Sequence, residues 1–346
     1  MLRQLGGKKP HTVKLLATFR HGRTYSLLFP WAECDLLMYW KRDRDTGHQG
    51  KTPTLILWVA HQCHGLLEAL HWIHGCDPSN MVKDRQNQPL YGRHGDIKPE
   101  NILWYKQDLD GPHALASGEL VLSDFGLSAL NHRQSRSNVK NGDFQHTTTY
   151  ASPESVLPDE LISRSIDIWA LGCVYLEFVT WVVGGSSLVG EFQGARLSPF
   201  LGSLHSNDVF WEVQELEVPT AENQKHVTVW IKNLRERTEA TNFIHDFLDI
   251  IANHMLVIEK KDRATVDQLL PRFSAIKANC DQDSSYYTEP STRTGDAVVA
   301  QIPAAQTLNI HTRVAIRRAS QALPRYTGQA EVRPQRNEAA YLKPPA

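Results

Sequence analysis

Two carboxylates, an amine and an amide lie close together in the sequence, in an order that suits phosphoryl transfer from a metal-bound nucleotide. Asp96 can orient a hydroxyl group and accept its proton, and Lys98 can lie beside the phosphoryl group in transit. Asn101 and Asp124 carry the oxygen atoms that hold Mg²⁺ in such a site. These residue types and spacings indicate transfer of a phosphoryl group to a hydroxyl acceptor.

The four residues belong to two short motifs. Residues 94–103 read HGDIKPENIL, and residues 123–126 read SDFG. Together they resemble the catalytic loop and the metal-binding loop of eukaryotic protein kinases. The roles that the resemblance implies are catalysis for Asp96 and Lys98, metal binding for Asn101 and Asp124, and loop structure for His94, Phe125 and Gly126.

The resemblance continues further along the chain. Residues 147–154 (TTTYASPE) resemble the end of the kinase activation segment, and residues 167–172 (DIWALG) resemble the central helix of the large lobe. Gly95 stands where many kinases carry an Arg that gathers a phosphate on the activation segment. Without that Arg, phosphorylation of the segment has no obvious charge partner.

Three structural contacts are implied by these later motifs. Asp167 is expected to bind the backbone of the catalytic loop, and Thr147 to bridge the two catalytic side chains. Glu154 is expected to pair with Arg263, because a buried carboxylate needs a charged partner.

The same resemblance implies a nucleotide pocket upstream of the catalytic loop. Residues 13–40 resemble the last two strands of the small lobe and the hinge, although short apolar runs of this kind are also typical of ordinary strands. The implied nucleotide contacts are Leu28 as gatekeeper, Phe29 and Trp31 in the hinge, Asp35 at the ribose and Leu103 beneath the adenine.

Hydrophobic periodicity and turn signals predict the elements that must position these residues. The expected strands are 13–19, 24–29 and 120–122, with a turn at 21–23. A first helix is expected to begin after Asp35, which would be its N-cap. Further helices are expected at residues 54–74 and 164–180, and two or three more within residues 226–276. Residues 75–92 and 127–149 are expected to be loops, and residues 184–225 have no clear pattern.

The predicted fold class is α+β and protein-kinase-like, with a mainly α-helical large lobe and a remnant of the small β lobe. Residues 1–35 are assigned to the small-lobe remnant and hinge, and residues 36–280 to the large lobe. Residues 281–346 lose apolar periodicity and are expected to form a disordered tail.

Composition excludes several other classes. The net charge of -1 gives no electrostatic reason to expect binding to nucleic acid or to a membrane. The 5 cysteines are widely spaced and contain no Cys-x-x-Cys pair, which is typical of reduced thiols in a cytoplasmic or nuclear protein. The longest apolar run, residues 166–183, contains two carboxylates and is expected to be a buried helix.

Four histidines on the long helix at 54–74 invite a zinc hypothesis, which we reject. His71 lies about 10 Å along the helix from His61, from a rise of about 1.5 Å per residue. No carboxylate or water-activating group accompanies them in the sequence pattern. The histidines are His61, His64, His71 and His74.

The implied reaction is transfer of the γ-phosphoryl group of ATP, with Mg²⁺, to a protein substrate. Lys98 two residues after Asp96 is the serine/threonine pattern. The sequence departs from the family at its start, because the residues before Val13 contain neither a Gly-rich phosphate loop nor a Lys–Glu pair. The chain therefore resembles a kinase domain truncated within the small lobe. A catalytically impaired interaction module, either a pseudokinase or a truncated gene product, remains the second hypothesis.

Overall fold

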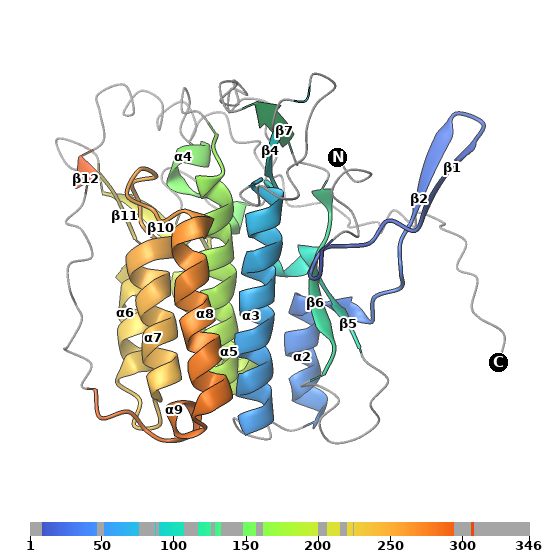
Figure 1. The fold of residues 1–346 in the computed structure, drawn as a ribbon. Coiled ribbons are helices and arrows are strands. Elements are labelled where there is room, and N and C mark those ends of the chain that lie inside the picture. The colour runs from blue at the N-terminus through green and yellow to red at the C-terminus, as the bar shows by residue number, and fades with distance from the viewer. Residues whose placement is uncertain are drawn as a thin grey trace.

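The computed structural model describes most of the chain between residues 9 and 293. The described residues are 9–46, 52–75, 87, 90–106, 117–125, 129–132, 148–156, 162–199, 206–214, 220–223, 225–293 and 306–307. They form an α+β structure in which a helical body carries β structure at one end and along one side (Figure 1). This agrees with the predicted fold class.

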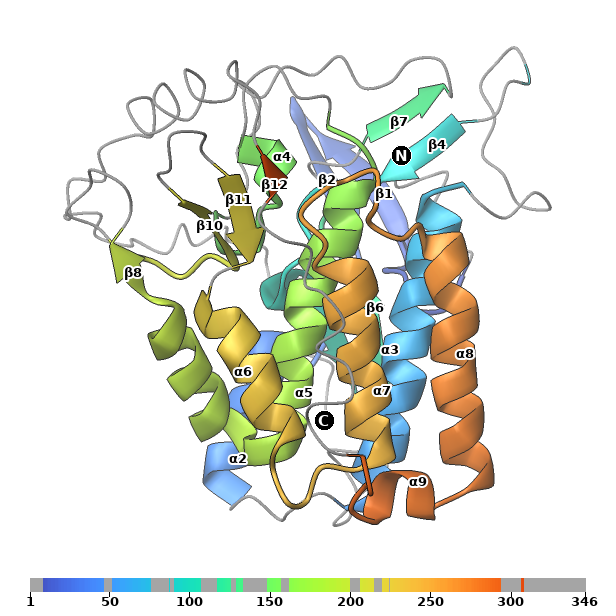
Figure 2. The ribbon, with the colours of Figure 1, turned by 90° about the vertical axis from the view of Figure 1, so that its left-hand side faces the viewer.

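Long helices run side by side through the body (Figures 1 and 2). α5 is central and its first half is buried on all sides, as its apolar sequence predicts. α3 packs against α8, and α2 packs against α5. The helices are α2 (Leu36–Thr46), α3 (Pro53–Ile73), α4 (Pro153–Val156), α5 (Ser165–Arg196), α6 (Lys225–Arg235), α7 (Asn242–Ile250), α8 (Val266–Gln282) and α9 (Ser285–Thr288). A π-helical turn, Ile251–Met255, follows α7.

Local sequence signals explain where these helices begin and end. The side chain of Thr52 accepts a hydrogen bond from the amide of Leu55 at 3.2 Å, and Pro53 fills the first position of α3. Gly75 follows the helix with a φ of 70°, a conformation that stops a helix and suits glycine. Asp35 caps α2 as predicted, because its Oδ1 accepts a hydrogen bond from the amide of Met38 at 2.7 Å.

Two sets of antiparallel strands hold the loops that matter for function. β3 (Cys34–Asp35), β5 (Ile102–Tyr105) and β6 (Glu119–Leu122) form a sheet in the order β3-β5-β6. β4 (Leu90–Arg93) pairs with β7 (Ala129–His132). Both strands of this second pair lie in segments whose polar sequence predicted loops. The backbone pairing between them corrects that prediction, since it does not depend on an apolar pattern.

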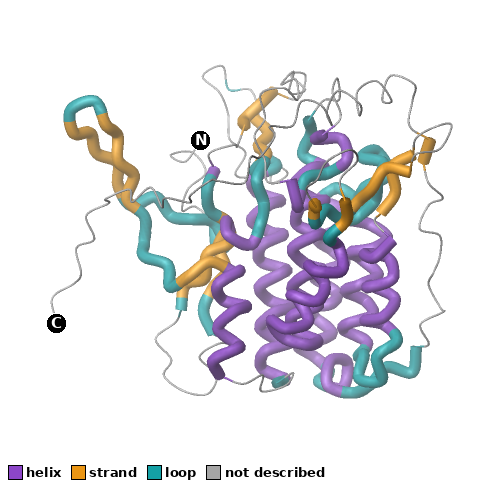
Figure 3. The backbone as a smooth tube through the Cα atoms, turned by 180° about the vertical axis from the view of Figure 1, so that it is seen from behind, coloured by secondary structure: helices purple, strands orange, loops and turns teal. Residues whose placement is uncertain are grey.

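The remaining strands form smaller groups. β1 (Ala17–His21) and β2 (Thr24–Leu28) make a two-stranded ribbon that projects from the body (Figures 1 and 3). The ribbon is joined to the body by a hydrogen bond from the amide of Val13 to the carbonyl of Leu122 at 2.9 Å. Elsewhere β8 (Ser198–Pro199) pairs with β9 (Ser206–Asn207), and β10 (Trp211–Gln214) with β11 (Thr220–Asn223) and β12 (Gln306–Thr307).

Two predicted boundaries need correction. α5 extends beyond residue 180 to Arg196, with a break in helical geometry at Gly184 and Gly185. The packed chain also continues past the boundary predicted at residue 280. α8 ends at Gln282, the side chains of Tyr286 and Tyr287 on α9 are buried, and Arg293 forms ion pairs with α7. Aromatic anchors within a polar stretch hold this segment to the body.

Among the described residues, α5 alone is long and apolar enough to cross a membrane, and that apolar stretch is entirely buried inside the fold. This is the arrangement of a core helix. The cysteines at 34, 63, 173 and 280 are free in the described structure.

Candidate active site

The loop between β4 and β5 brings three of the predicted functional side chains together. The ammonium of Lys98 lies 2.8 Å from Oδ2 of Asp96. The amide nitrogen of Asn101 donates to the same oxygen at 3.0 Å and to the backbone carbonyl of Asp96 at 2.8 Å. Asn101 is buried at the end of a short 3-10 helix, whereas Asp96 and Lys98 are partly exposed. The buried Asn101 therefore fixes Asp96, while Asp96 and Lys98 remain partly accessible to solvent.

Asp124 lies at the same end of the central sheet as Asn101. Asn101 immediately precedes β5 and Asp124 follows β6, and these two strands are antiparallel partners. The amide and the hydroxyl of Ser123 both donate to the backbone carbonyl of Asn101, at 2.9 Å each. Asp124 is exposed, with a φ of 55°. Its neighbour Phe125 is buried and packs against the ring of His94, with centroids 5.1 Å apart.

Asn101 and Asp124 offer oxygen donor atoms that suit a divalent cation. The nitrogen of the Asn101 amide is engaged with Asp96, so its carbonyl oxygen is the atom suited to a metal. Asp124 contributes an exposed carboxylate at the same strand end. One amide oxygen and one carboxylate make part of the kind of oxygen shell that Mg²⁺ uses, in which phosphate oxygens and water complete the coordination.

Asp167 anchors the loop to the first turn of α5. Its carboxylate accepts hydrogen bonds from the amides of His94 at 2.9 Å and of Gly95 at 2.8 Å. A third bond joins it to Nε2 of His74 at 2.9 Å. Burial by itself raises the pKa of Asp167, but these hydrogen bonds and the neighbouring histidines hold that pKa below its usual value. The backbone contact expected from the sequence is present.

His94 is held as a neutral imidazole. Its Nε2 lies 2.8 Å from the carbonyl of Ser123, so this nitrogen carries the proton and donates. Its Nδ1 accepts a hydrogen bond from the amide of Asp96 at 3.3 Å. Burial lowers the pKa of His94, against the opposing charge of Asp167. His94 therefore joins the catalytic loop to the strand that leads to Asp124.

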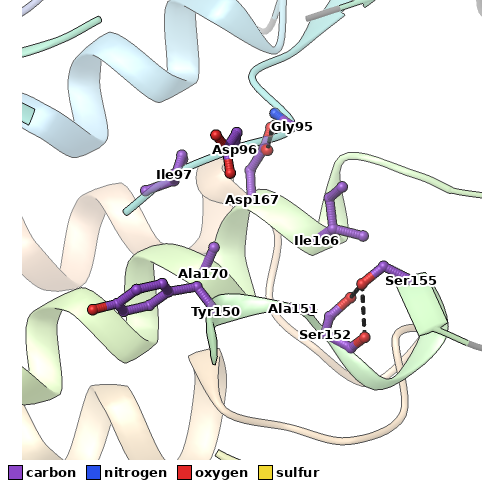
Figure 4. Close-up of a pocket in the computed structure, with 10 residues that line it drawn as sticks. All are labelled: Gly95, Asp96, Ile97, Tyr150, Ala151, Ser152, Ser155, Ile166, Asp167 and Ala170. Atoms are coloured by element: carbon purple, nitrogen blue, oxygen red, sulfur yellow. Dashed lines mark hydrogen bonds between the residues drawn. The ribbon is translucent and has the colours of Figure 1, made fainter. Parts of the chain in front are cut away.

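A small cavity lies between the catalytic loop, segment 148–156 and the start of α5 (Figure 4). Its volume is about 20 Å³, and Asp96, Ser152, Ser155 and Asp167 are among its lining residues. This volume suits a single water molecule with polar partners, and it is far below the roughly 300 Å³ of a small-ligand pocket. The cavity borders Asp96 but is not a nucleotide site.

Segment 148–156 is tied to α5 and to the residues that follow it. The hydroxyl of Tyr150 donates to Oε2 of Glu177 at 2.8 Å, and Arg196 donates to Oε1 of the same carboxylate at 2.7 Å. The hydroxyl of Thr149 donates to Asp208 at 2.6 Å. Burial, followed by the Glu177 carboxylate, raises the pKa of Tyr150 well above its usual value. These contacts fix the backbone that faces the catalytic loop.

Arg196 is the centre of this arrangement. Its side chain is fully buried, and its guanidinium lies 4.1 Å from the ring centroids of both Phe192 and Phe210. Its Nε donates to the backbone carbonyl of Asp208 at 3.2 Å. Sequence reasoning missed Arg196 and Asp208, because both lie in the stretch that carried no clear pattern. From the sequence, Glu177 was noted only as a carboxylate within an apolar run. A carboxylate in such a run is the one signal that could have indicated a buried cationic partner.

The predicted nucleotide-contact residues are only partly brought together. Asp35 and Leu103 are paired neighbours in the β3–β5 ladder, and Phe29 packs against the core. Leu28 is half-exposed on the projecting ribbon, and Trp31 is 74% exposed. A gatekeeper lies against the nucleotide site, so the exposed position of Leu28 does not support that role. Gly126 and Thr147 lie outside the described residues.

Comparison with known proteins settles the family. Residues 1–184, more than half of the 346-residue chain, match the family model for the protein kinase domain. The chain belongs to the eukaryotic protein kinase family. The match covers the catalytic loop, the central sheet and the first half of α5.

Relatives of this kinase-family chain have modest identity to it. It is 28% identical over 210 residues to a probable cyclin-dependent kinase 8 of Dictyostelium discoideum, covering 59% of this chain and 46% of the relative. It is 31% identical over 180 residues to the human cyclin-dependent kinase-like 4, covering 52% and 38%. A serine/threonine-protein kinase SSN3 of Chaetomium globosum is 25% identical over 171 residues, covering 49% and 28%. The chain thus spans less than half the length of these curated relatives.

Proposed function

We propose that this chain is a protein serine/threonine kinase that transfers the γ-phosphoryl group of ATP, with Mg²⁺, to a hydroxyl of a protein substrate. The observation that carries the proposal is the cluster at the catalytic loop. Oδ2 of Asp96 lies within 2.8 Å of the Lys98 ammonium and 3.0 Å of the Asn101 amide nitrogen. Asp124 follows at the same end of the sheet.

Each side chain has a role that its position supports. Asp96 receives the hydrogen bond of the acceptor hydroxyl and takes up its proton as the hydroxyl oxygen bonds to the γ-phosphorus, while the bond from that phosphorus to the bridging oxygen breaks and ADP leaves. Lys98, beside it, offers positive charge to the phosphoryl oxygens. The Asn101 oxygen and the Asp124 carboxylate would hold Mg²⁺, and Mg²⁺-ATP supplies the phosphoryl group together with the charge that neutralises it. Catalysis of this kind is positioning and electrostatics.

The nucleotide base would lie near the paired residues Asp35 and Leu103. Leu103 is partly exposed on β5, and Phe29 packs against the core. The Oδ1 atom of Asp35 already caps α2, so the other carboxylate oxygen is the one suited to a ribose hydroxyl. We propose a cytoplasmic or nuclear location, which is supported by the free thiols of the described cysteines.

One observation favours the second candidate, a kinase-like interaction module without catalysis. The ribbon that should cover a nucleotide carries Leu28 half-exposed and lies apart from the helical body (Figure 3). A module of this kind would keep the described fold but would not bind nucleotide at the catalytic loop.

Titration with a fluorescent ATP analogue separates these two candidates. We expect Mg²⁺-dependent binding that is weakened in Asp124→Asn and Asn101→Ala variants and unchanged in Glu191→Gln, which alters an exposed carboxylate on α5. A peptide phosphorylation assay then tests chemistry, and Asp96→Asn should lower turnover by about 10²-fold or more, the usual contribution of a general base. Binding that is the same in the wild type and in both metal-site variants would refute the proposal.

A further inference from the structure

Three consecutive residues of segment 148–156 are held by side chains from later parts of the chain. The hydroxyl of Thr149 donates to the carboxylate of Asp208 at 2.6 Å. The carbonyl of Ala151 accepts a hydrogen bond from the indole nitrogen of Trp211 at 3.0 Å. The residue between them donates its hydroxyl to α5. The backbone here is a short 3-10 turn, whose internal hydrogen bonds have poor geometry, so these outside contacts determine where it lies.

Arg196 connects two of these contacts. Its Nη2 donates to Oε1 of Glu177 at 2.7 Å, and the other oxygen of that carboxylate accepts from Tyr150. Its Nε donates to the backbone carbonyl of Asp208 at 3.2 Å, and its Nη2 lies 3.9 Å from the Asp208 carboxylate. The Arg196 side chain has no exposed surface and cannot touch a substrate. Any effect that it has on the reaction must therefore pass through segment 148–156.

The segment that is held in this way faces the proposed catalytic base. Asp96 and residues 150–152 line the same small cavity (Figure 4). A protein that places a hydroxyl at Asp96 must lay its flanking residues over the neighbouring surface, to which the segment belongs. The proposed metal ligands belong to other elements, since Asn101 precedes β5 and Asp124 follows β6. A displaced segment should therefore affect the acceptor and spare the nucleotide.

We propose that Arg196 and Asp208 are positioning residues for the protein acceptor. They hold segment 148–156 at the place where it supports the residues on either side of the acceptor hydroxyl. The inference rests on the proposed phosphoryl transfer and adds the part of the fold that positions its acceptor. A displacement of about 1 Å is enough to lower the rate of such a reaction by about 10²-fold, so a strongly held segment matters.

A role in stability alone would leave a different signature. Arg196 also stabilises the fold, because its buried charge is paired with Glu177. A purely structural contact lowers the folded fraction and leaves the kinetic constants of the folded protein unchanged. A positioning contact raises the apparent KM for the acceptor in a protein that is fully folded.

Steady-state kinetics on the full chain test the proposal. The acceptor is a degenerate peptide mixture with one fixed Ser or Thr, and the second readout is hydrolysis of ATP by water without any peptide. Asp208 is the residue to replace, because its side chain is 34% exposed and lies outside the core. Asp208→Ala should raise the apparent KM for the peptides by about tenfold or more and change ATP hydrolysis by less than about twofold. Asp208→Asn keeps an oxygen that accepts from Thr149 and should restore most of the loss.

Two further variants and a control locate the effect. Thr149→Val should raise the apparent KM by a similar factor, and combining it with Asp208→Ala should add little, because both act through one hydrogen bond. Arg196→Lys keeps the charge but lacks the planar fork, so it should raise the apparent KM as well. Glu191→Gln is the matched control on the same helix, since it neutralises an exposed carboxylate and should change nothing.

Hydrogen–deuterium exchange gives a readout that needs no activity. In Asp208→Ala the amides of segment 148–156 should exchange about tenfold faster, because the contact that holds them is lost. The amides of residues 97–105, in the catalytic loop and β5, should keep their wild-type exchange. Far-UV circular dichroism checks that every variant is folded.

Three results would overturn the inference while leaving the proposed function intact. The first is an unchanged apparent KM in both Asp208→Ala and Thr149→Val. The second is an equal loss of peptide phosphorylation and of ATP hydrolysis, and the third is unchanged exchange in segment 148–156. A wild-type chain that phosphorylates no peptide in the mixture would refute the proposed function, and this inference with it.

Discussion

Arg263 donates two hydrogen bonds to the carboxylate of Glu154, across 109 residues of sequence, with distances of 2.6 Å from Nη1 and 3.0 Å from Nη2. The Arg263 side chain has no exposed surface and that of Glu154 is 6% exposed. Arg263 also donates to the backbone carbonyls of Val257 and Ser165. One guanidinium thus joins segment 148–156, the start of α5 and the turn before α8.

Glu154→Ala should lower the free energy of unfolding by about 3–5 kcal/mol, because it leaves the buried Arg263 charge without its carboxylate. Chemical denaturation at pH 7 measures this. Glu239→Ala is the matched control, since it removes a carboxylate from an ion pair with Arg237 at the surface and should change stability by less than about 1 kcal/mol. Equal effects of the two substitutions would contradict the assigned role.

Burial by itself raises the pKa of Glu154, but Arg263 outweighs it and holds that pKa below its usual value. The unfolded chain therefore takes up the proton first as the pH falls. The contribution of the pair is complete above the unfolded pKa of about 4.3 and is lost as the pH falls through the lower, folded value. The difference between wild type and Glu154→Ala should shrink accordingly in acid.

The buried pair of Glu177 and Arg196 should behave as a unit. Glu177→Gln keeps an acceptor for Tyr150 but removes the charged oxygen that lies 2.7 Å from Arg196, and the other carboxylate, that of Asp208, is 3.9 Å away, so the substitution should cost about 3–5 kcal/mol. The double variant Glu177→Gln with Arg196→Met should be less destabilised than the sum of the single variants, because neither charge is then left alone. Denaturation of all four proteins gives the coupling energy. Simple additivity would show that the two side chains do not depend on each other.

Gly95 has a φ of 90°, a region that other residues adopt only with strain. Gly95→Ala should therefore lower the free energy of unfolding by about 1–2 kcal/mol. Gly190→Ala on α5 is the control, because a Cβ at that position meets no atom within 4 Å and alanine favours a helix. Thermal melts compare the two, and a neutral Gly95→Ala would argue against strain at the catalytic loop.

The free energy of unfolding should decrease as the pH is lowered from 7.5 to 5.5. Burial lowers the pKa values of His74 and His94 in the folded protein, against the opposing charge of Asp167. The unfolded chain binds protons near pH 6.5 while the folded chain resists them, so the free energy of unfolding is greatest above that pH and declines below it. Protonation of His94 would also place a proton on Nδ1, which accepts from the Asp96 amide.

Urea denaturation at several pH values checks this expectation. His94→Asn should flatten the dependence on pH, because it removes one of the two buried imidazoles whose pKa burial lowers. A free energy of unfolding that is constant from pH 7.5 to 5.5 in the wild type would show that the buried imidazoles do not control it.

The sequence by itself determined the parts of the site that are local in the chain. Asp96, Lys98 and Asn101 lie within one turn-rich loop, so their spacing alone predicts that they meet. The helix at 54–74 and the N-cap at Asp35 also followed from local patterns, because periodicity and capping involve residues a few positions apart. The expected partners of Asp167 and Glu154 came from resemblance to a family, and the structure contains both contacts.

Tertiary structure alone decided the long-range features. The pairing of β4 with β7 joins two polar segments, so no apolar pattern in the sequence predicted it. Arg196 lies between two aromatic rings because α5 changes direction at Gly185 and because Phe210, which follows later in the chain, packs against the Arg196 guanidinium. The exposure of Leu28 could not be predicted from the sequence either. Its apolar type predicts burial, but burial requires a neighbouring surface, and whether one lies against a strand is a property of the assembled fold and not of the strand's own residues.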